Sequence, residues 1–197
     1  MVRQLRPEIT TLAWLALALT FLTLATVAHE ATKDRVILAP GYSVLTYEAP
    51  KAGTYKLPKM RLADDAVFID SHNQTGSLKD LFNDKVTILS FIYTGCDDAN
   101  GCPLATFVMS KIAKGLEADA AIREHAQLVS FSFDLHRDTP EVLENYGKSF
   151  RTKNVSWAFV GSPNQESLKR TLTDYDQSIQ ELAGHKYAHL LRVFLID

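Results

Sequence analysis

The chain has 197 residues, of which 46% are hydrophobic, and a formal net charge of -2. This length suits one targeting segment and one domain whose core is large enough to be stable without a disulfide framework. Nucleic acid is disfavoured as the main partner, because phosphate binding requires a concentrated surface of lysine and arginine and the sequence has no such run.

The N-terminus has the pattern of a targeting segment. Two arginines precede an apolar run that ends near Ala28. This order predicts a signal peptide or membrane anchor over residues 1–28 and export to a compartment in which thiols can be oxidised. Residues 29–52 contain Pro40, Gly41 and Pro50 and are typical of a tether, so we expect the domain to occupy residues 53–197.

The first half of the domain begins with short extended segments. Residues 55–57 and 67–69 predict the two strands of an opening hairpin, and residues 77–82 predict a short helix capped by Ser77. Residues 85–94 are apolar on both faces, as a central strand covered on both sides must be.

Helices and strands then alternate. Gly95 ends the central strand, residues 96–101 form a loop, and Pro103 begins a helix. Its expected apolar face consists of Leu104, Phe107, Val108, Ile112 and Leu116. The later strands are expected at residues 128–133, 157–160 and 191–196, and the later helices after the caps Thr139 and Ser162. This alternation predicts a three-layer α/β domain with a largely parallel sheet, whose chemistry belongs at the carboxyl end of a central strand.

The chain has only two cysteines, Cys96 and Cys102, and both lie in this strand-to-helix turn. A helix N-terminus favours thiolate, which is the nucleophile of disulfide exchange and the soft ligand that selects Cu(I). Five residues separate the pair, whereas thioredoxin-type redox pairs have two, but the longer loop can still chelate an ion or form a bridge. The pair is therefore a candidate metal site or redox couple, and the alternative is two small buried apolar residues.

Histidine could complete a metal site. His189 directly precedes the expected last strand, whose start can lie beside the cysteine loop, so its imidazole would give a three-coordinate Cys-Cys-His site. His185 is the rival ligand. A zinc site of both cysteines and both histidines is a further alternative, since the histidine spacing is permitted, although the cysteine spacing exceeds the usual range and a domain with a large core needs no structural zinc.

Three stretches together resemble the SCO/SenC family of copper chaperones. They are LSFIYTGCDDANGCPLA at residues 89–105, SFDLHRDTPEVLENYG at residues 132–147 and HLLRVFLID at residues 189–197. The resemblance implies a thioredoxin-like α/β fold with a central mixed sheet flanked by helices, anchored at a membrane and facing an extracytoplasmic space such as the periplasm. It also implies copper delivery to the CuA centre of cytochrome c oxidase, or thiol reduction that prepares that centre.

Carried over to this chain, the resemblance implies that Cys96, Cys102 and His189 bind copper and that Asp134 lies near them in a supporting role. The expected partners are the oxidase subunit that bears CuA and the membrane. The sequence departs from the family in three ways. The family usually has three residues between its cysteines, an aspartate often stands at the position of Ala188, and the family's final strand and helix do not follow within these 197 residues.

The class of function stays open between a binding protein and an enzyme. Two thiolates and an imidazole favour a copper chaperone. The alternative is a thiol-disulfide oxidoreductase in which Cys96 and Cys102 form the catalytic redox pair, and a third hypothesis is a redox or copper sensor.

Overall fold

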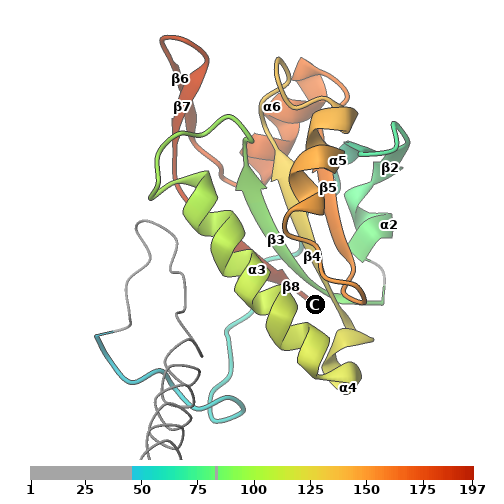
Figure 1. Cartoon of the computed structure of the whole chain (residues 1–197), viewed down its shortest axis with the longest axis vertical. Coiled ribbons are helices and arrows are strands. Elements are labelled where there is room, and N and C mark those ends of the chain that lie inside the picture. The colour runs from blue at the N-terminus through green and yellow to red at the C-terminus, as the bar shows by residue number, and fades with distance from the viewer. Residues whose placement is uncertain (1–45, 83) are drawn as a thin grey trace, which may run out of the picture. The chain divides into compact units, whose positions relative to one another are not determined.

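The structure is a computed structural model that describes residues 46–82 and 84–197 (Figure 1). The expected signal peptide or anchor at residues 1–28, and the tether up to residue 45, lie outside the described residues. Within them, no helix combines the length and the apolar character needed to cross a membrane.

A six-stranded sheet forms the centre of the domain, in the strand order β2-β1-β5-β4-β3-β8. Its strands are β1 (Val67–Asp70), β2 (Thr75–Ser77), β3 (Val86–Ile92), β4 (Ala126–Ser132), β5 (Trp157–Gly161) and β8 (Val193–Ile196). The inner strands β3, β4 and β5 are parallel, whereas β1 and β8 run antiparallel to their neighbours. The sheet is therefore mixed, as the family resemblance implies, and not largely parallel as the alternation alone predicts.

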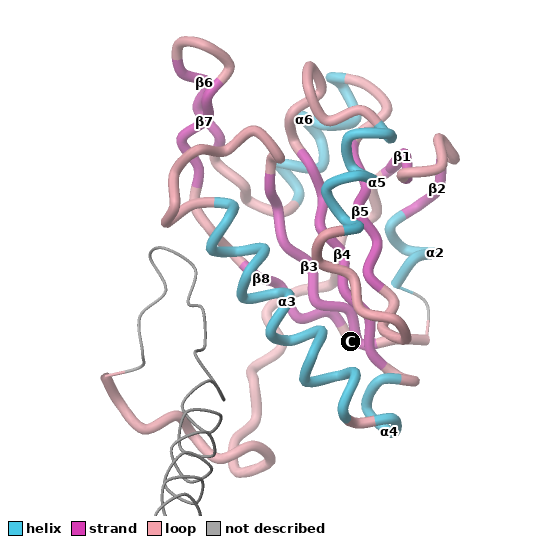
Figure 2. Tube along the Cα trace, in the orientation of Figure 1, coloured by secondary structure: helices cyan, strands magenta, loops and turns pink. Residues whose placement is uncertain are grey.

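Helices cover both faces of this sheet. They are α2 (Leu78–Phe82), α3 (Cys102–Ala118), α4 (Ala120–Arg123), α5 (Pro140–Lys148) and α6 (Gln165–Asp174). Helix α3 connects β3 to β4, and α5 connects β4 to β5. Both connections step across the sheet in the same direction, so right-handed crossovers place both helices on one face. Helix α6 lies behind the strands in the view of Figure 2. The core between these layers is rich in aromatic side chains, including Phe91, Phe131 and Phe159.

A second hairpin, which the sequence analysis did not anticipate, stands at the carboxyl end of β3 (Figure 1). It consists of β6 (Ile179–Leu182) and β7 (Lys186–His189), which pair antiparallel. Gly184 and His185 have positive φ angles of 76° and 56° in its turn. His189 therefore ends this hairpin and does not directly precede the last strand.

Two expected details of the helix and strand ends are wrong. Residues 55–57 form no strand, and β1 pairs with β2 instead, since the sequence of such short segments does not specify their partners. Helix α6 is capped by Asn164, whose side chain accepts the backbone N–H of Ser167 at 2.9 Å, and not by Ser162. The expected caps Ser77 and Thr139 are confirmed, with bonds of 3.4 and 3.3 Å from backbone N–H groups.

Helix α3 faces the sheet with a different side from the one expected. Its buried residues are Cys102, Thr106, Met109, Ser110 and Ala113, whereas Leu104, Phe107 and Val108 are half-buried. The buried residues are mostly small, and they let the helix lie close to the strands. Consequently Cys102 belongs to the inner face of the helix and not to its surface.

Close packing of α5 against β5 depends on Gly147. A Cβ atom at this position would lie 2.6 Å from the buried ring of Phe159, so we expect Gly147→Ala to destabilise the fold by about 1–3 kcal/mol through overpacking. The matched control is Gly115→Ala in α3, where a Cβ atom meets no neighbour, and which should stabilise the helix by about 0.5–1 kcal/mol. Urea unfolding of both variants measures the difference, and equal effects would contradict the close contact.

Candidate metal centre

The strand pairing explains how residues far apart in sequence reach one place. In the antiparallel register of β3 and β8, Val193 lies opposite Ser90, so β8 begins near the carboxyl end of β3. The chain that leads into β8 therefore returns to the strand-to-helix turn. There His189 Nε2 lies 3.3 Å from Cys102 Sγ.

Cys102 is the first residue of α3 and is completely buried. Its sulfur accepts the backbone N–H of Tyr93 at 3.3 Å. Burial raises the pKa of the Cys102 thiol well above its ordinary value, because the low-polarity surroundings disfavour thiolate more than this N–H and the helix N-terminus favour it. The lowered pKa that the sequence position alone suggests is therefore wrong for this cysteine, which is a neutral thiol when no metal is bound.

Cys96 lies in the loop between β3 and α3 and is half-buried. Its sulfur packs against Gly101, where a Cβ atom would come within 2.9 Å of it. Its thiol lies 3.9 Å from the carbonyl oxygen of Asp98, and the nearby Cys96 contributes to the raised pKa of the Cys102 thiol. Both thiols are free, with no disulfide between them.

The ring of His189 is held by aromatic side chains. It packs against Phe133 and Tyr93, with ring centroids 4.9 and 6.1 Å away. Nδ1 of His189 lies 3.3 Å from the carbonyl oxygen of Leu190, which can only accept, so this nitrogen carries the proton. Nε2 consequently presents its lone pair to Cys102, and burial lowers the pKa of the imidazole and keeps it neutral.

A buried carboxylate that the sequence analysis did not single out fixes the start of the cysteine loop. Asp138 accepts the backbone N–H of Thr94 at 2.9 Å and also the hydroxyl groups of Thr94 and Ser132. It thereby ties the end of β3 to the turn that follows β4. In the sequence, Asp138 directly precedes the helix cap Thr139. An aspartate in such a position commonly accepts hydrogen bonds from nearby backbone groups, and this was the signal from which a structural role could have been predicted.

Asp134 supports the hairpin. Its Oδ1 accepts the backbone N–H of His136 at 3.0 Å and the hydroxyl of Tyr187 at 3.4 Å. Tyr187 in turn packs edge-on against Phe133, which holds the His189 ring. Asp134 Oδ2 is buried and has no hydrogen-bond partner. A continuous series of contacts thus runs from this carboxylate through Tyr187 and Phe133 to the His189 ring.

The rival ligand His185 is directed elsewhere. It lies at the tip of the hairpin, where Nδ1 is 3.1 Å from Glu181 Oε1 and its ring centroid is 5.1 Å from that of His136. The four-ligand zinc arrangement is therefore not assembled. Across residues 46–82 and 84–197, no three histidine, cysteine or carboxylate side chains already form a closed set of metal ligands. Of the three expected ligands, Cys102 and His189 are in contact, and a closed set requires Cys96 to turn toward them.

A salt bridge connects the hairpin to the cysteine loop. Lys186 Nζ lies 2.5 Å from Asp97 Oδ2 and holds the pKa of that carboxyl below its usual range. The pair is exposed, so it contributes little to stability. It nevertheless keeps the loop that carries Cys96 beside the strand that carries His189.

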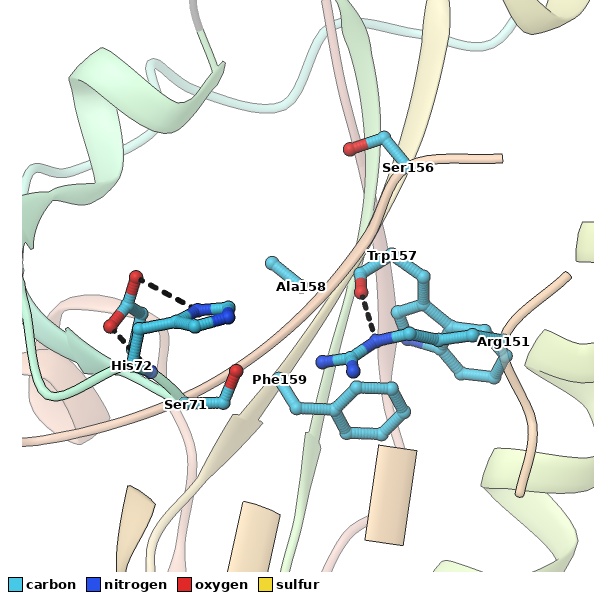
Figure 3. A pocket seen from close by; sticks show the side chains of 8 residues that line it. Ser71, His72, Arg151, Ser156, Trp157, Ala158 and Phe159 are labelled. Carbon is cyan, nitrogen blue, oxygen red and sulfur yellow. Dashed lines mark hydrogen bonds and ion pairs between the residues drawn. The ribbon is translucent and has the colours of Figure 1, made fainter. Parts of the chain in front are cut away.

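A hollow of about 300 Å³ lies at the junction of β1 and β5 (Figure 3). Its charged side chains already have partners. His72 Nδ1 lies 3.8 Å from Asp70 Oδ2, and Arg151 donates to the carbonyl of Trp157 at 3.1 Å and to Glu144 at 2.7 Å. None of the expected metal ligands lines this hollow, so it is separate from the thiol site.

The fold and this site together define a class of protein. The chain is an α/β protein of thioredoxin-like fold, with two thiols at the strand-to-helix turn and an imidazole beside them. The SCO1/SenC family model matches residues 59–197, and the chain belongs to this family.

Individual relatives agree with this assignment. A candidate copper-binding protein of Stutzerimonas stutzeri is 31% identical over 121 residues, which are 61% of this chain and 54% of the relative. The chain thus spans about half the length of that relative. The structure of Arabidopsis thaliana ScoI with copper bound matches this chain with a TM-score of 0.60 at 20% identity. The match covers 70% of this chain and 82% of the ScoI chain.

A further structure, that of BsSco, describes a disulfide switch in a member of the Sco family of cytochrome c oxidase assembly proteins. It matches this chain with a TM-score of 0.55 at 20% identity, and the match covers 71% of this chain and 86% of the BsSco chain. At such identities the two solved structures show a shared fold.

The lowered pKa of His189 predicts an acid-sensitive fold. Its neutral imidazole stabilises the folded state above the ordinary histidine pKa of about 6.5, and this contribution is lost as the pH falls below that value, because the unfolded chain takes up the proton first. We expect His189→Gln to flatten the decline of unfolding free energy between about pH 7 and pH 5, measured in urea without metal. The control is His125→Gln, outside the site, and an equally steep decline in the His189 variant would contradict the assignment.

Proposed function

We propose that the chain is a copper-binding chaperone in which Cys96, Cys102 and His189 hold the ion. The observation that carries the proposal is the 3.3 Å contact between His189 Nε2 and Cys102 Sγ, with Cys96 in the loop that leads into the same helix. Membership in the SCO1/SenC family, the copper-binding relative of Stutzerimonas stutzeri and the copper-bound ScoI support the choice of metal.

The chemistry of the three groups suits Cu(I). Thiolate and imidazole are ligands that this soft ion prefers. The neutral tautomer of His189 already presents Nε2, and Cys102 must lose its proton when the ion binds. Copper uptake should therefore release protons and strengthen as the pH rises. The five-residue loop lets Cys96 adjust its position without moving α3.

We further propose that the protein delivers this copper to the subunit of cytochrome c oxidase that bears the CuA centre. The description of BsSco as a member of a family of oxidase assembly proteins supports this client. Residues 1–28 would then act as a signal peptide or anchor, residues 29–52 as a tether, and residues 53–197 as the copper-carrying domain at the extracytoplasmic side of a membrane.

Copper stoichiometry tests the ligand set. The reduced chain should bind about one equivalent of Cu(I) in competition with a Cu(I) chelator, and Cys96→Ser, Cys102→Ser or His189→Gln should each weaken binding by roughly tenfold or more, since even changes outside the ligand shell have effects of this size. His125→Gln, which changes a histidine outside the site, should leave binding unchanged. Unaltered affinity in the His189 variant would remove this residue from the centre.

The second candidate is a thiol-disulfide oxidoreductase, which the presence of two free thiols at one strand-to-helix turn favours. In that reaction Cys96 and Cys102 lose two electrons and two protons to a substrate disulfide, form a disulfide between themselves, and release two substrate thiols. The raised pKa of Cys102 disfavours it as the attacking group, so Cys96 would attack first.

A reductase assay separates the two candidates. If copper binding is the function, the reduced chain should reduce a small disulfide only slowly, and both Cys96→Ser and His189→Gln should lower copper affinity. If turnover is fast in the wild type, is lost in the Cys96 variant and is fully retained in the His189 variant, the oxidoreductase is the better assignment.

A further inference from the structure

A second group of metal-ligating side chains lies at the tip of the β6–β7 hairpin. Glu181 and Tyr187 are directly paired across its strands and therefore share a face. Tyr187 donates to Asp134, which also accepts the backbone N–H of His136. This face of the hairpin is thus turned toward the segment that follows β4, and His136 and His185 meet between the two.

Two separations within this group are compatible with ligands of one ion. His185 Nδ1 and Glu181 Oε1 are 3.1 Å apart, which is close to the separation of neighbouring ligand atoms that are each about 2.0–2.2 Å from a shared metal. The imidazole centroids of His136 and His185 are 5.1 Å apart. Two imidazoles bound to one tetrahedral ion at about 2.0–2.1 Å have centroids roughly 5 Å apart.

We propose that Glu181, His185 and His136 form a second, surface site for a divalent transition-metal ion, independent of the thiol centre. The three groups do not form a ligand set as they stand, so binding of an ion requires the His136 ring to rotate toward His185 and Glu181. This rotation is unhindered by deep packing, since His136 is exposed and the side chains of His185 and Glu181 are 60% and 54% exposed.

The donor set distinguishes this site from the thiol centre. Two imidazoles and a carboxylate form a set known from zinc enzymes, and without thiolate they favour Cu(II) and Zn(II) over Cu(I). Cu(II) should bind more tightly than Zn(II), following the general order of affinities. The neighbouring ammonium of Lys186 is paired with Asp97, which limits its repulsion of a bound cation.

The site is tested in the full chain with the thiol centre disabled by Cys96→Ser and His189→Gln, two changes that leave the buried Cys102 in place. Titration with Cu(II) should show about one tight equivalent, and electron paramagnetic resonance should show hyperfine splitting from two imidazole nitrogens. Adding His136→Gln, His185→Gln or Glu181→Gln should weaken binding by roughly tenfold or more, and each histidine change should remove one nitrogen from the spectrum.

The matched control is His72→Gln, because His72 also lies beside a carboxylate, that of Asp70, but belongs to a different part of the fold. It should change neither affinity nor spectrum. Equal weakening by His72→Gln and His185→Gln, or several weak equivalents that no substitution alters, would overturn the proposal. If the variant with Cys96→Ser and His189→Gln does not fold, the wild type and the double variant His136→Gln/His185→Gln are titrated with Zn(II) instead. The double variant should bind one equivalent of Zn(II) fewer than the wild type, and an unchanged number overturns the proposal. Neither result depends on copper binding by the thiols.

Discussion

The antiparallel pairing of β8 with β3 is the contact on which the geometry of the thiol site depends. Parallel strands β3, β4 and β5 have their carboxyl ends at one edge of the sheet, and the cysteine loop follows β3. A strand added in the opposite direction must begin at that same edge, so the residues before it are delivered to the loop. The β6–β7 hairpin then determines which of them face inward. This arrangement brings His189 to Cys102 across a separation of 87 residues.

Burial and not charge governs the protonation of this pair. Cys102 is held as a thiol and His189 as a neutral imidazole, both because the surroundings disfavour ions. A neutral S–H group facing a nitrogen lone pair is a stable resting arrangement. A metal ion replaces the shared proton and supplies the positive charge that a thiolate needs in an apolar site. The same burial that suppresses thiol reactivity in the free protein thus favours exchange of a proton for a soft cation.

The sequence predicted the α/β class, the three inner strands and the caps Ser77 and Thr139, and it placed His189 beside Cys102. It could do so because periodicity, capping chemistry and a family motif are local signals. It missed the β6–β7 hairpin, whose strands are short and exposed, and the role of Asp138, which depends on a contact with Thr94 44 residues away. It also misjudged the protonation of Cys102, because burial is a property of the assembled core and not of the helix N-terminus.

The hairpin links the two proposed metal sites without merging them. His185 and His189 lie at opposite ends of β7, and four residues of extended chain span roughly 13 Å. No ion can share ligands across that distance, so each site keeps its own preference, soft Cu(I) at the thiols and a divalent ion at the tip. Between them, Lys186 holds Asp97 of the cysteine loop. An ion bound at the tip would order the strand that positions both Lys186 and His189, and any coupling between the sites must therefore pass through β7.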